Sequence, residues 1–184
     1  MKKIIKTIST FLVILMTFTT LCLSPENISL IKAEAASFND INNSSVFIKG
    51  TSGRCTLASA VMMVRRTAMA TGNTGWANIT ENSMKSSAWI DGQGLRRSFS
   101  YSGISVKHAY LSSNIDNASE LRDILNNHPE GIVLYNADYP HAILLTDYTN
   151  GIFYCADPDL GPSKGRIPIT EAYKQKVTIN NADR

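Results

Sequence analysis

Apolar residues recur at helical spacing directly after Cys55. They follow one another at steps of four, three and four residues: Leu57, Val61, Val64 and Ala68. This period places side chains on one face of an α-helix, and small residues and methionines fill the same side. The pattern predicts a buried helix over residues 55–70, with Cys55 in its first turn.

Shorter patterns predict the remaining elements. The polar segment 37–53 is typical of a loop or edge strand that leads into a turn. We expect helices over 80–89 and 119–127, a short helix over 95–101, and strands over 104–110 and 131–136. The amino-terminal half of the chain is therefore predicted to be mainly helical and the carboxyl-terminal half mainly strand.

Two apolar runs, residues 141–148 and 152–158, flank the sequence Thr149-Asn150-Gly151. An Asn-Gly step between apolar runs is a strong signal for a two-residue hairpin turn. A turn that pairs Thr149 with Ile152 places Asp157 opposite Leu144. His141 and Asp157 are then expected toward the same open end of the hairpin.

The first 35 residues differ in character from the rest. Lysines at the start precede a largely apolar stretch over residues 7–23, and Ala33-Glu34-Ala35 supplies small residues at a cleavage position. This order predicts a signal peptide and an exported protein, secreted to the extracellular space or the cell envelope. The alternative is a retained membrane anchor, but the stretch contains several Thr and Ser residues and falls short of the ~20 apolar residues that span a bilayer.

Residues 36–184 fit a single domain that is long enough to bury a core. The formal charge of the whole chain is +3, but residues 1–35 hold four lysines and two glutamates, so only +1 remains on the predicted mature domain. This charge gives no indication of a nucleic-acid partner. The sequence contains no later apolar run long enough to span a bilayer, so we expect no second membrane segment. It does not predict an oligomeric state.

The predicted mature domain contains two cysteines, Cys55 and Cys155. Secreted domains that depend on disulfides usually carry several pairs. A Cys55–Cys155 bridge stays open as an alternative and would leave no nucleophilic thiol. Without a bridge, Cys155 is expected to point into the core.

Cys55, His141 and Asp157 are the candidate catalytic residues. A thiol at a helix start is biased toward thiolate, because the helix N-terminus favours negative charge and offers backbone N–H groups to a developing oxyanion. His141 at the mouth of the hairpin is the best placed base, and Asp157 could orient its ring. The alternatives are a buried structural thiol, a histidine that ends a strand, and an ordinary Asp-Pro turn.

Other residue patterns do not change this interpretation. A metal site is not expected, because neither Cys-x-x-Cys nor His-x-x-x-His spacing occurs. We expect the pairs Arg65-Arg66 and Arg96-Arg97 at the solvated surface. We expect the aromatic residues to pack in the core rather than line a groove: Trp76, Trp89, Phe99 and Tyr101.

The segment Ser52–Ala60 resembles the nucleophile helix of papain-like cysteine peptidases. Within that superfamily, His141–Leu145 followed by Asp157-Pro158 resembles the bacteriocin-processing, double-glycine peptidase group and its secreted bacterial relatives. The resemblance implies an α+β fold in which a helical lobe carrying Cys55 packs on an antiparallel sheet lobe. It also implies a peptide or protein substrate, no cofactor, and the roles of nucleophile, base and orienting acid for Cys55, His141 and Asp157.

Two positions depart from the pattern of that family. Lys49 stands six residues before Cys55, where such enzymes usually place the glutamine of the oxyanion hole, and Arg54-Cys55-Thr56 replaces Asp-Cys-Gly or Asn-Cys-Gly. The second oxyanion donor is therefore not assigned. Besides the thiol hydrolase, the sequence leaves open a catalytically silent binding or inhibitory module and a transglutaminase-like acyl transferase.

Overall fold

The computed structural model describes residues 45–110, 118–136, 140–173 and 179–183, all within the unit Ser37–Arg184. The predicted signal peptide, residues 1–35, lies outside this range. Among the helices of the described residues, none has both the length and the apolar character that crossing a bilayer requires.

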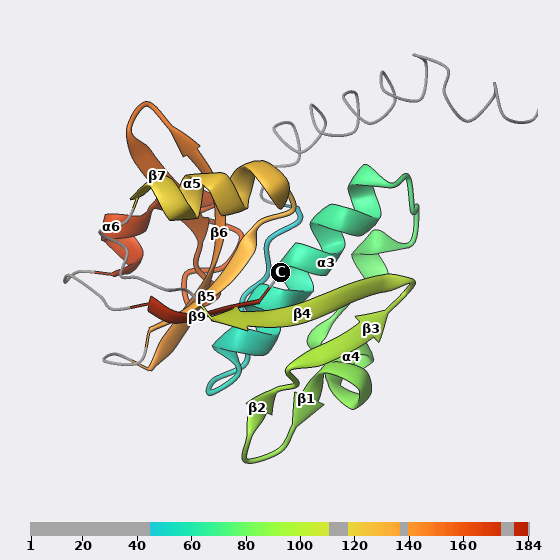
Figure 1. Cartoon of the computed structure of the whole chain (residues 1–184). Helices are drawn as coiled ribbons and strands as arrows, with labels where there is room; N and C mark the ends of the chain where they lie inside the picture. Colours follow the sequence, from blue (N-terminus) through green and yellow to red (C-terminus); the bar gives the residue numbers. More distant parts are fainter. Residues whose placement is uncertain (1–44, 111–117, 137–139, 174–178, 184) are drawn as a thin grey trace, which may run out of the picture. The chain divides into compact units, whose positions relative to one another are not determined.

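The described chain is a mixed α+β fold (Figure 1). Its helices are α3 (Cys55–Ala70), α4 (Glu81–Ala88), α5 (Ala118–Asn127) and α6 (Ile169–Ala172), with a 3-10 turn η1 (Trp76–Asn78). Its strands are β1 (Trp89–Ile90), β2 (Gly94–Leu95), β3 (Ser98–Tyr101), β4 (Ile104–Tyr110), β5 (Ile132–Asn136), β6 (His141–Thr149), β7 (Ile152–Ala156), β8 (Arg166–Pro168) and β9 (Ile179–Asp183). The predicted α+β class is confirmed.

Seven of these strands form one sheet in the order β3-β4-β9-β5-β6-β7-β8, and β1 and β2 form a separate pair. Every pair of neighbours in the large sheet is antiparallel, as expected. The β6–β7 hairpin therefore continues the sheet beyond β5, and β8 follows β7 at the edge.

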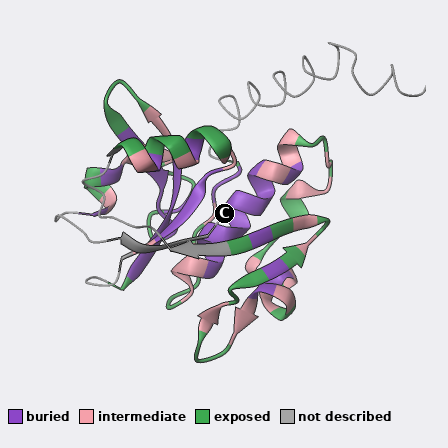
Figure 2. Cartoon of the chain, in the orientation of Figure 1, coloured by how far each residue is buried: buried purple, intermediate pink, exposed green. Residues whose placement is uncertain are grey.

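Helices cover both faces of β5 and β6, which explains the uninterrupted apolar run after His141. Val133 and Leu144 pack in one core cluster with α3, whereas Leu134 and Ile143 pack in a second cluster with α5 and α6. Alternate residues of a strand point to opposite faces, so a strand covered on both sides is apolar throughout. Figure 2 shows this buried centre in α3, β5 and β6.

The predicted helix over residues 55–70 is confirmed by α3. The second predicted helix corresponds to α4, where Thr80 is the N-cap. The Thr80 hydroxyl oxygen accepts from the Ser83 amide, and the Thr80 amide donates to the Ser83 hydroxyl oxygen. This reciprocal pair satisfies two donors that the first helical turn would leave free.

The short helix predicted over residues 95–101 is wrong, because this segment forms β2 and β3. Tyr101 pairs with Ile104 across a two-residue turn in which Ser102 and Gly103 both have positive φ. Gly103 therefore completes a hairpin turn rather than ending a helix. In β3 the side chain of Phe99 is buried between exposed neighbours, the alternation of a strand with one covered face.

The prediction that Arg65 and Arg66 lie at the surface is also wrong. Their exposed fractions are 9% and 1%. Arg65 donates from Nε to the Ile79 carbonyl at 2.7 Å and from a terminal nitrogen to the Ala77 carbonyl at 2.9 Å. Arg66 donates to the carbonyl of Pro129 at 3.1 Å. Backbone carbonyls of neighbouring segments thus accept hydrogen bonds from both buried guanidinium groups.

The hairpin turn is confirmed, but its register near the site differs from the prediction. Thr149 pairs with Ile152, whereas Leu144 pairs with Ala156 rather than with Asp157. The register shifts by one residue because Thr146 forms a β-bulge. The Thr146 hydroxyl donates to the Tyr154 carbonyl at 3.1 Å. Asp157 consequently follows the last residue of β7.

Candidate active site

Cys55 is the first residue of α3 and is partly exposed. The N-terminal amides of this helix have no side-chain cap, and its first turn contains no acidic residue. The partial positive charge of the helix N-terminus is therefore left to act on the thiol.

Several contacts change the acidity of Cys55. Burial raises the pKa of the thiol, but hydrogen bonds with the His141 side chain and with the backbone amides of Ala142 and Thr56 lower it, as does the positive charge of His141. The net effect is a pKa below the ordinary value. The site thus favours the thiolate, the nucleophilic form of cysteine.

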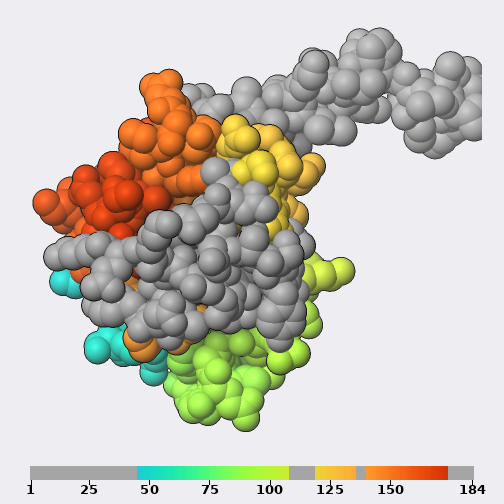
Figure 3. Space-filling model, turned by 60° about the vertical axis from the view of Figure 1, so that its left-hand side comes forward, coloured from blue at the N-terminus to red at the C-terminus, as the bar shows by residue number. Residues whose placement is uncertain are grey.

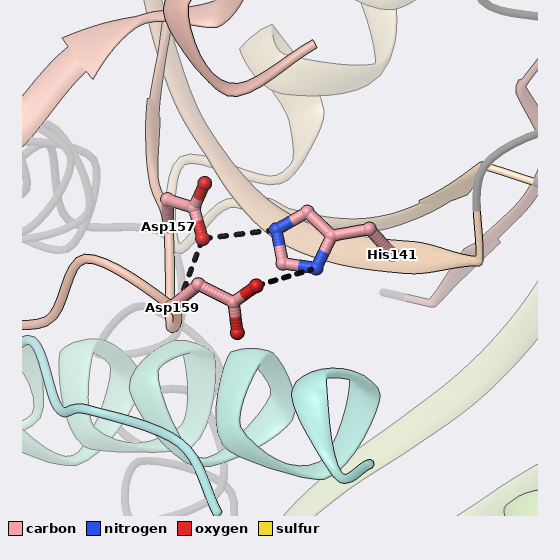
Figure 4. Close-up of side chains that lie close together, drawn as sticks. All are labelled: His141, Asp157 and Asp159. Carbon is pink, nitrogen blue, oxygen red and sulfur yellow. Dashed lines mark hydrogen bonds and ion pairs between the residues drawn. The ribbon is translucent and has the colours of Figure 1, made fainter. Parts of the chain in front are cut away.

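His141 begins β6, and Asp157 follows the end of β7, so the hairpin brings both to one edge of the sheet. Nε2 of His141 lies 2.9 Å from Oδ1 of Asp157, and the exposed fractions of the two side chains are 6% and 7% (Figure 4). Because Asp157 engages Nε2, Nδ1 is the ring nitrogen that remains for Cys55.

The carboxylates and the thiol together favour a charged imidazole. Burial lowers the pKa of His141, but hydrogen bonds with Asp157 and Cys55 and the negative charges of Asp157 and Asp159 raise it to about 10. A lowered pKa of Cys55 beside a raised pKa of His141 favours a thiolate–imidazolium pair.

Asp159 is a second carboxylate beside His141, and it was not identified from the sequence. Its Oδ2 lies 3.7 Å from Nδ1 of His141, and its backbone amide donates to Oδ1 of Asp157 at 2.8 Å. Figure 4 shows one carboxylate beside each nitrogen of the ring. The Asp-Pro-Asp sequence, with two carboxylates one residue apart in a turn, was the signal that could have found it.

One donor atom each from His141, Asp157 and Asp159 lies within 4.8 Å of the others, close enough to hold a metal ion. In the described structure Oδ1 of Asp157 accepts from Nε2 of His141 and from the Asp159 amide. A metal ion bound to His141 would compete with these contacts. Two hard carboxylates and one imidazole do not identify a particular metal.

The loop before Cys55 contacts the turn that holds Asp157. The Gly50 amide donates to the Pro158 carbonyl at 2.9 Å. A Cβ atom on Gly161 would lie 2.9 Å from the Cβ of Lys49, so the two segments pack closely. In the space-filling view, cyan atoms of the segment around residues 45–55 adjoin orange atoms of the second half of the chain (Figure 3). Lys49, which replaces the expected glutamine, is thus placed beside this turn.

Cys155 and Cys55 are both free thiols, so the structure does not contain the alternative Cys55–Cys155 disulfide. Cys155 is fully buried in the core cluster that includes Leu145 and Ile167, as predicted for an inward-facing residue. Burial is the main cause that raises the pKa of its thiol. Cys155 therefore stays protonated and does not compete with Cys55 for electrophiles.

Tyr173 supports His141 from the side of α6. Its hydroxyl lies 3.3 Å from the carbonyls of both Leu134 and His141, and its ring meets the imidazole edge-on at a centroid distance of 6.2 Å. Tyr173 is 6% exposed. The tyrosine thus fixes the backbone at the start of β6 and covers one side of the imidazole.

The three predicted site residues lie together although they come from the start of α3, the start of β6 and the turn after β7. His128, a second histidine of the chain, lies elsewhere and pairs with Glu130 at 3.0 Å. Comparison of the chain with models of known families, with curated proteins and with solved structures gives no match.

Proposed function

We propose that this chain is a papain-like cysteine hydrolase that cleaves a peptide or isopeptide amide. One observation carries the proposal: the imidazole of His141, whose Nε2 lies 2.9 Å from Asp157, interacts with the thiol of Cys55 at the head of α3. A nucleophile that contacts a base, which a third group orients, is the arrangement that acyl-transfer enzymes use.

The first chemical step would form an acyl-enzyme. The Cys55 thiolate attacks the carbonyl carbon, a C–S bond forms, and the carbonyl electron pair moves to oxygen. When the intermediate collapses, the C–N bond breaks and the leaving nitrogen takes the proton from Nδ1 of His141. A thioester and a neutral imidazole remain.

The second step would release the acid product. Nδ1 of His141 takes a proton from water while the water oxygen attacks the thioester carbon. The C–S bond then breaks, and the sulfur leaves as the thiolate. The carboxylic acid product departs, and the thiolate–imidazolium pair is restored.

The N-terminal amides of α3 would supply the oxyanion contact. They lack a side-chain cap, and the Thr56 amide is one of the groups that lower the pKa of the Cys55 thiol. An oxyanion formed at the carbon attached to that sulfur would lie near the same helix end, where one donor is worth a few kcal/mol, about 2.7–4. Lys49 leaves the second donor unassigned.

The resemblance supports peptide substrates and an exported location. A helix that carries the cysteine and packs on an antiparallel sheet that carries the histidine agrees with a papain-like arrangement, although other α+β folds share that description. The signal-like residues 1–35 would direct the hydrolase out of the cell.

Labelling and turnover test the proposal together. The mature chain is incubated with iodoacetamide, the modified cysteine is identified by mass spectrometry, and a peptide mixture is searched for new termini. We expect a Cys55 adduct and cleavage that Cys55→Ala abolishes, that Cys155→Ser preserves and that a chelator leaves unchanged. Cleavage by Cys55→Ala at the wild-type rate would contradict the proposal.

The same assay separates the other two candidate functions. A reactive Cys55 without any cleavage of the mixture would favour the silent binding module. If an added primary amine diverts most of the acyl group from water, the chain is an acyl transferase that uses the same three residues.

A further inference from the structure

We propose that Asp159 selects substrates whose leaving amine carries a positive charge next to the scissile bond, such as a peptide with lysine directly after the cleaved bond. This inference rests on the proposed hydrolase, whose substrate class it narrows. Asp159 would act as a specificity residue at the edge of the site rather than as a member of the catalytic group.

Geometry places Asp159 on the leaving-group side. Its Oδ2 lies 3.7 Å from Nδ1 of His141. Nδ1 must come within about 3 Å of the leaving nitrogen to protonate it. The carboxylate therefore lies within roughly 7 Å of that nitrogen, which is within reach of a side chain on the leaving residue.

Exposure distinguishes the two carboxylates beside His141. The side chain of Asp157 is 7% exposed and accepts from both His141 and the Asp159 amide, whereas the side chain of Asp159 is 70% exposed. Solvent, or a bound substrate, can reach Asp159 directly. Asp157 is occupied with the imidazole, so Asp159 is the carboxylate that can contact a ligand.

The backbone of the turn fixes the position of Asp159. The amides of Leu160 and Gly161 both donate to the Asp157 carbonyl, at 3.1 and 3.0 Å. The Asp159 amide donates to the Asp157 side chain. These bonds present the Asp159 carboxylate at a defined place although its side chain is exposed.

The reaction itself creates the need for a cation. In the resting site, Asp159 faces an imidazolium, because the pKa of His141 is raised. When Nδ1 gives its proton to the leaving nitrogen, the imidazole becomes neutral and Asp159 loses its positive neighbour. An ammonium group on the leaving residue replaces that charge as the bond breaks, whereas a neutral residue does not.

The test compares peptides that differ at the residue after the cleaved bond. A cleaved sequence found in the peptide mixture is remade with lysine, with its uncharged analogue norleucine and with glutamate at that position. For the wild type we expect kcat/KM to be about two- to fivefold higher for lysine than for norleucine, the range of an exposed ion pair. Glutamate should be the poorest of the three.

Two substitutions and a control complete the test. Asp159→Asn should bring the lysine-to-norleucine ratio close to one, and Asp159→Lys should make glutamate better than lysine. Asp123→Asn changes another aspartate, on α5, which packs on the opposite face of the sheet from α3, and should leave the ratio at the wild-type value. Iodoacetamide labelling of Cys55 in each variant shows that the site is intact.

Each outcome bears on one proposal or the other. The inference is overturned if the wild type cleaves without a preference for lysine, or if the preference persists in Asp159→Asn and Asp159→Lys. Either result leaves the proposed hydrolase activity unaffected. If Cys55 of the wild-type chain is unreactive and no peptide is cleaved, the proposed hydrolase activity is contradicted. The proposed selection of substrates by Asp159 is then contradicted as well.

Discussion

His141 Nε2 and Asp157 Oδ1 lie 2.9 Å apart across the open end of the β6–β7 hairpin. A regular hairpin from the Asn150-Gly151 turn would have placed Asp157 opposite Leu144. The bulge at Thr146 shifts β7 by one residue, so that Ala156 takes that place and Asp157 falls beyond the strand. The relation between the imidazole and the carboxylate therefore depends on an irregularity in the middle of the hairpin.

Substitution of Asp157 should separate its hydrogen bond from its charge. In Asp157→Asn the amide oxygen can still accept from Nε2, so we expect turnover to fall by roughly tenfold, whereas Asp157→Ala should cost about a hundredfold or more. Both changes remove a negative charge that raises the pKa of His141, so that pKa should fall below about 10. Peptide cleavage measured against pH reports both effects. Equal rates in the two variants and the wild type would contradict an orienting role.

The thiolate–imidazolium pair predicts different pH profiles for labelling and for turnover. Below the lowered pKa of Cys55 the thiol is protonated, so iodoacetamide labelling and turnover should both decline. Above about pH 10 His141 loses its proton, so turnover should fall because the leaving nitrogen has no acid, whereas labelling should continue.

His141→Ala is the matched control for these profiles. Labelling of Cys55 in this variant should rise only near the ordinary cysteine pKa of about 8.5, because the hydrogen bond and the charge of the imidazolium are gone. Mass spectrometry distinguishes Cys55 from Cys155. Fast labelling of the variant at neutral pH would show that the helix N-terminus alone activates the thiol.

The sequence was sufficient for elements whose signals are local. The apolar spacing from Leu57 to Ala68 predicted α3, and the Asn150-Gly151 step predicted the turn, in which both residues have positive φ. Cys55, His141 and Asp157 could be singled out because a helix start and a hairpin end each restrict where a side chain can lie. These constraints act within about a dozen residues of the chain.

What the sequence missed depends on contacts between distant segments. The buried positions of Arg65 and Arg66 require backbone carbonyls of η1, of Ile79 and of the loop before β5 as acceptors. No local sequence pattern predicts these acceptors. The bulge at Thr146 depends on a hydroxyl that bonds across the hairpin. The nearness of Asp159 to Nδ1 of His141 follows from the turn that the bulge positions.

Arg65 should contribute to stability, in contrast to an arginine at the surface. Arg65→Met removes two donors and leaves the carbonyls of Ile79 and Ala77 without them, which we expect to cost about 2–3 kcal/mol of unfolding free energy. Arg97→Met changes an exposed side chain and should stay within about 0.5 kcal/mol. Urea unfolding of the two variants gives the comparison. A similar small effect for both would show that Arg65 makes no net contribution.

Gly161 should couple the turn after Asp157 to the loop before Cys55. Its φ is +71°, and an added Cβ would lie 2.9 Å from the Cβ of Lys49, so Gly161→Ala incurs both backbone strain and a clash. Gly165 has a similar φ of +61°, but a Cβ added there would have no heavy atom within 4 Å, so Gly165→Ala is the control for strain without a clash. We expect the control to lose about 1–2 kcal/mol from strain alone and Gly161→Ala to lose more. Gly161→Ala should also label more slowly at Cys55. Equal losses of stability and equal labelling would mean that the two segments are independent.

Tyr173 should act on the reaction through the position of His141. Tyr173→Phe removes the hydroxyl that bonds the carbonyls of Leu134 and His141 but keeps the ring edge against the imidazole. We expect it to lose about 1 kcal/mol of stability and to label at Cys55 within about twofold of the wild-type rate. Tyr173→Leu also removes the aromatic edge, so the imidazole can turn away from Cys55, and labelling at neutral pH should slow by roughly tenfold. If Tyr173→Leu unfolds more easily yet labels at the wild-type rate, Tyr173 stabilises the core without holding the imidazole. If Tyr173→Phe is as slow as Tyr173→Leu, the hydroxyl, through the backbone of His141, is what positions the ring.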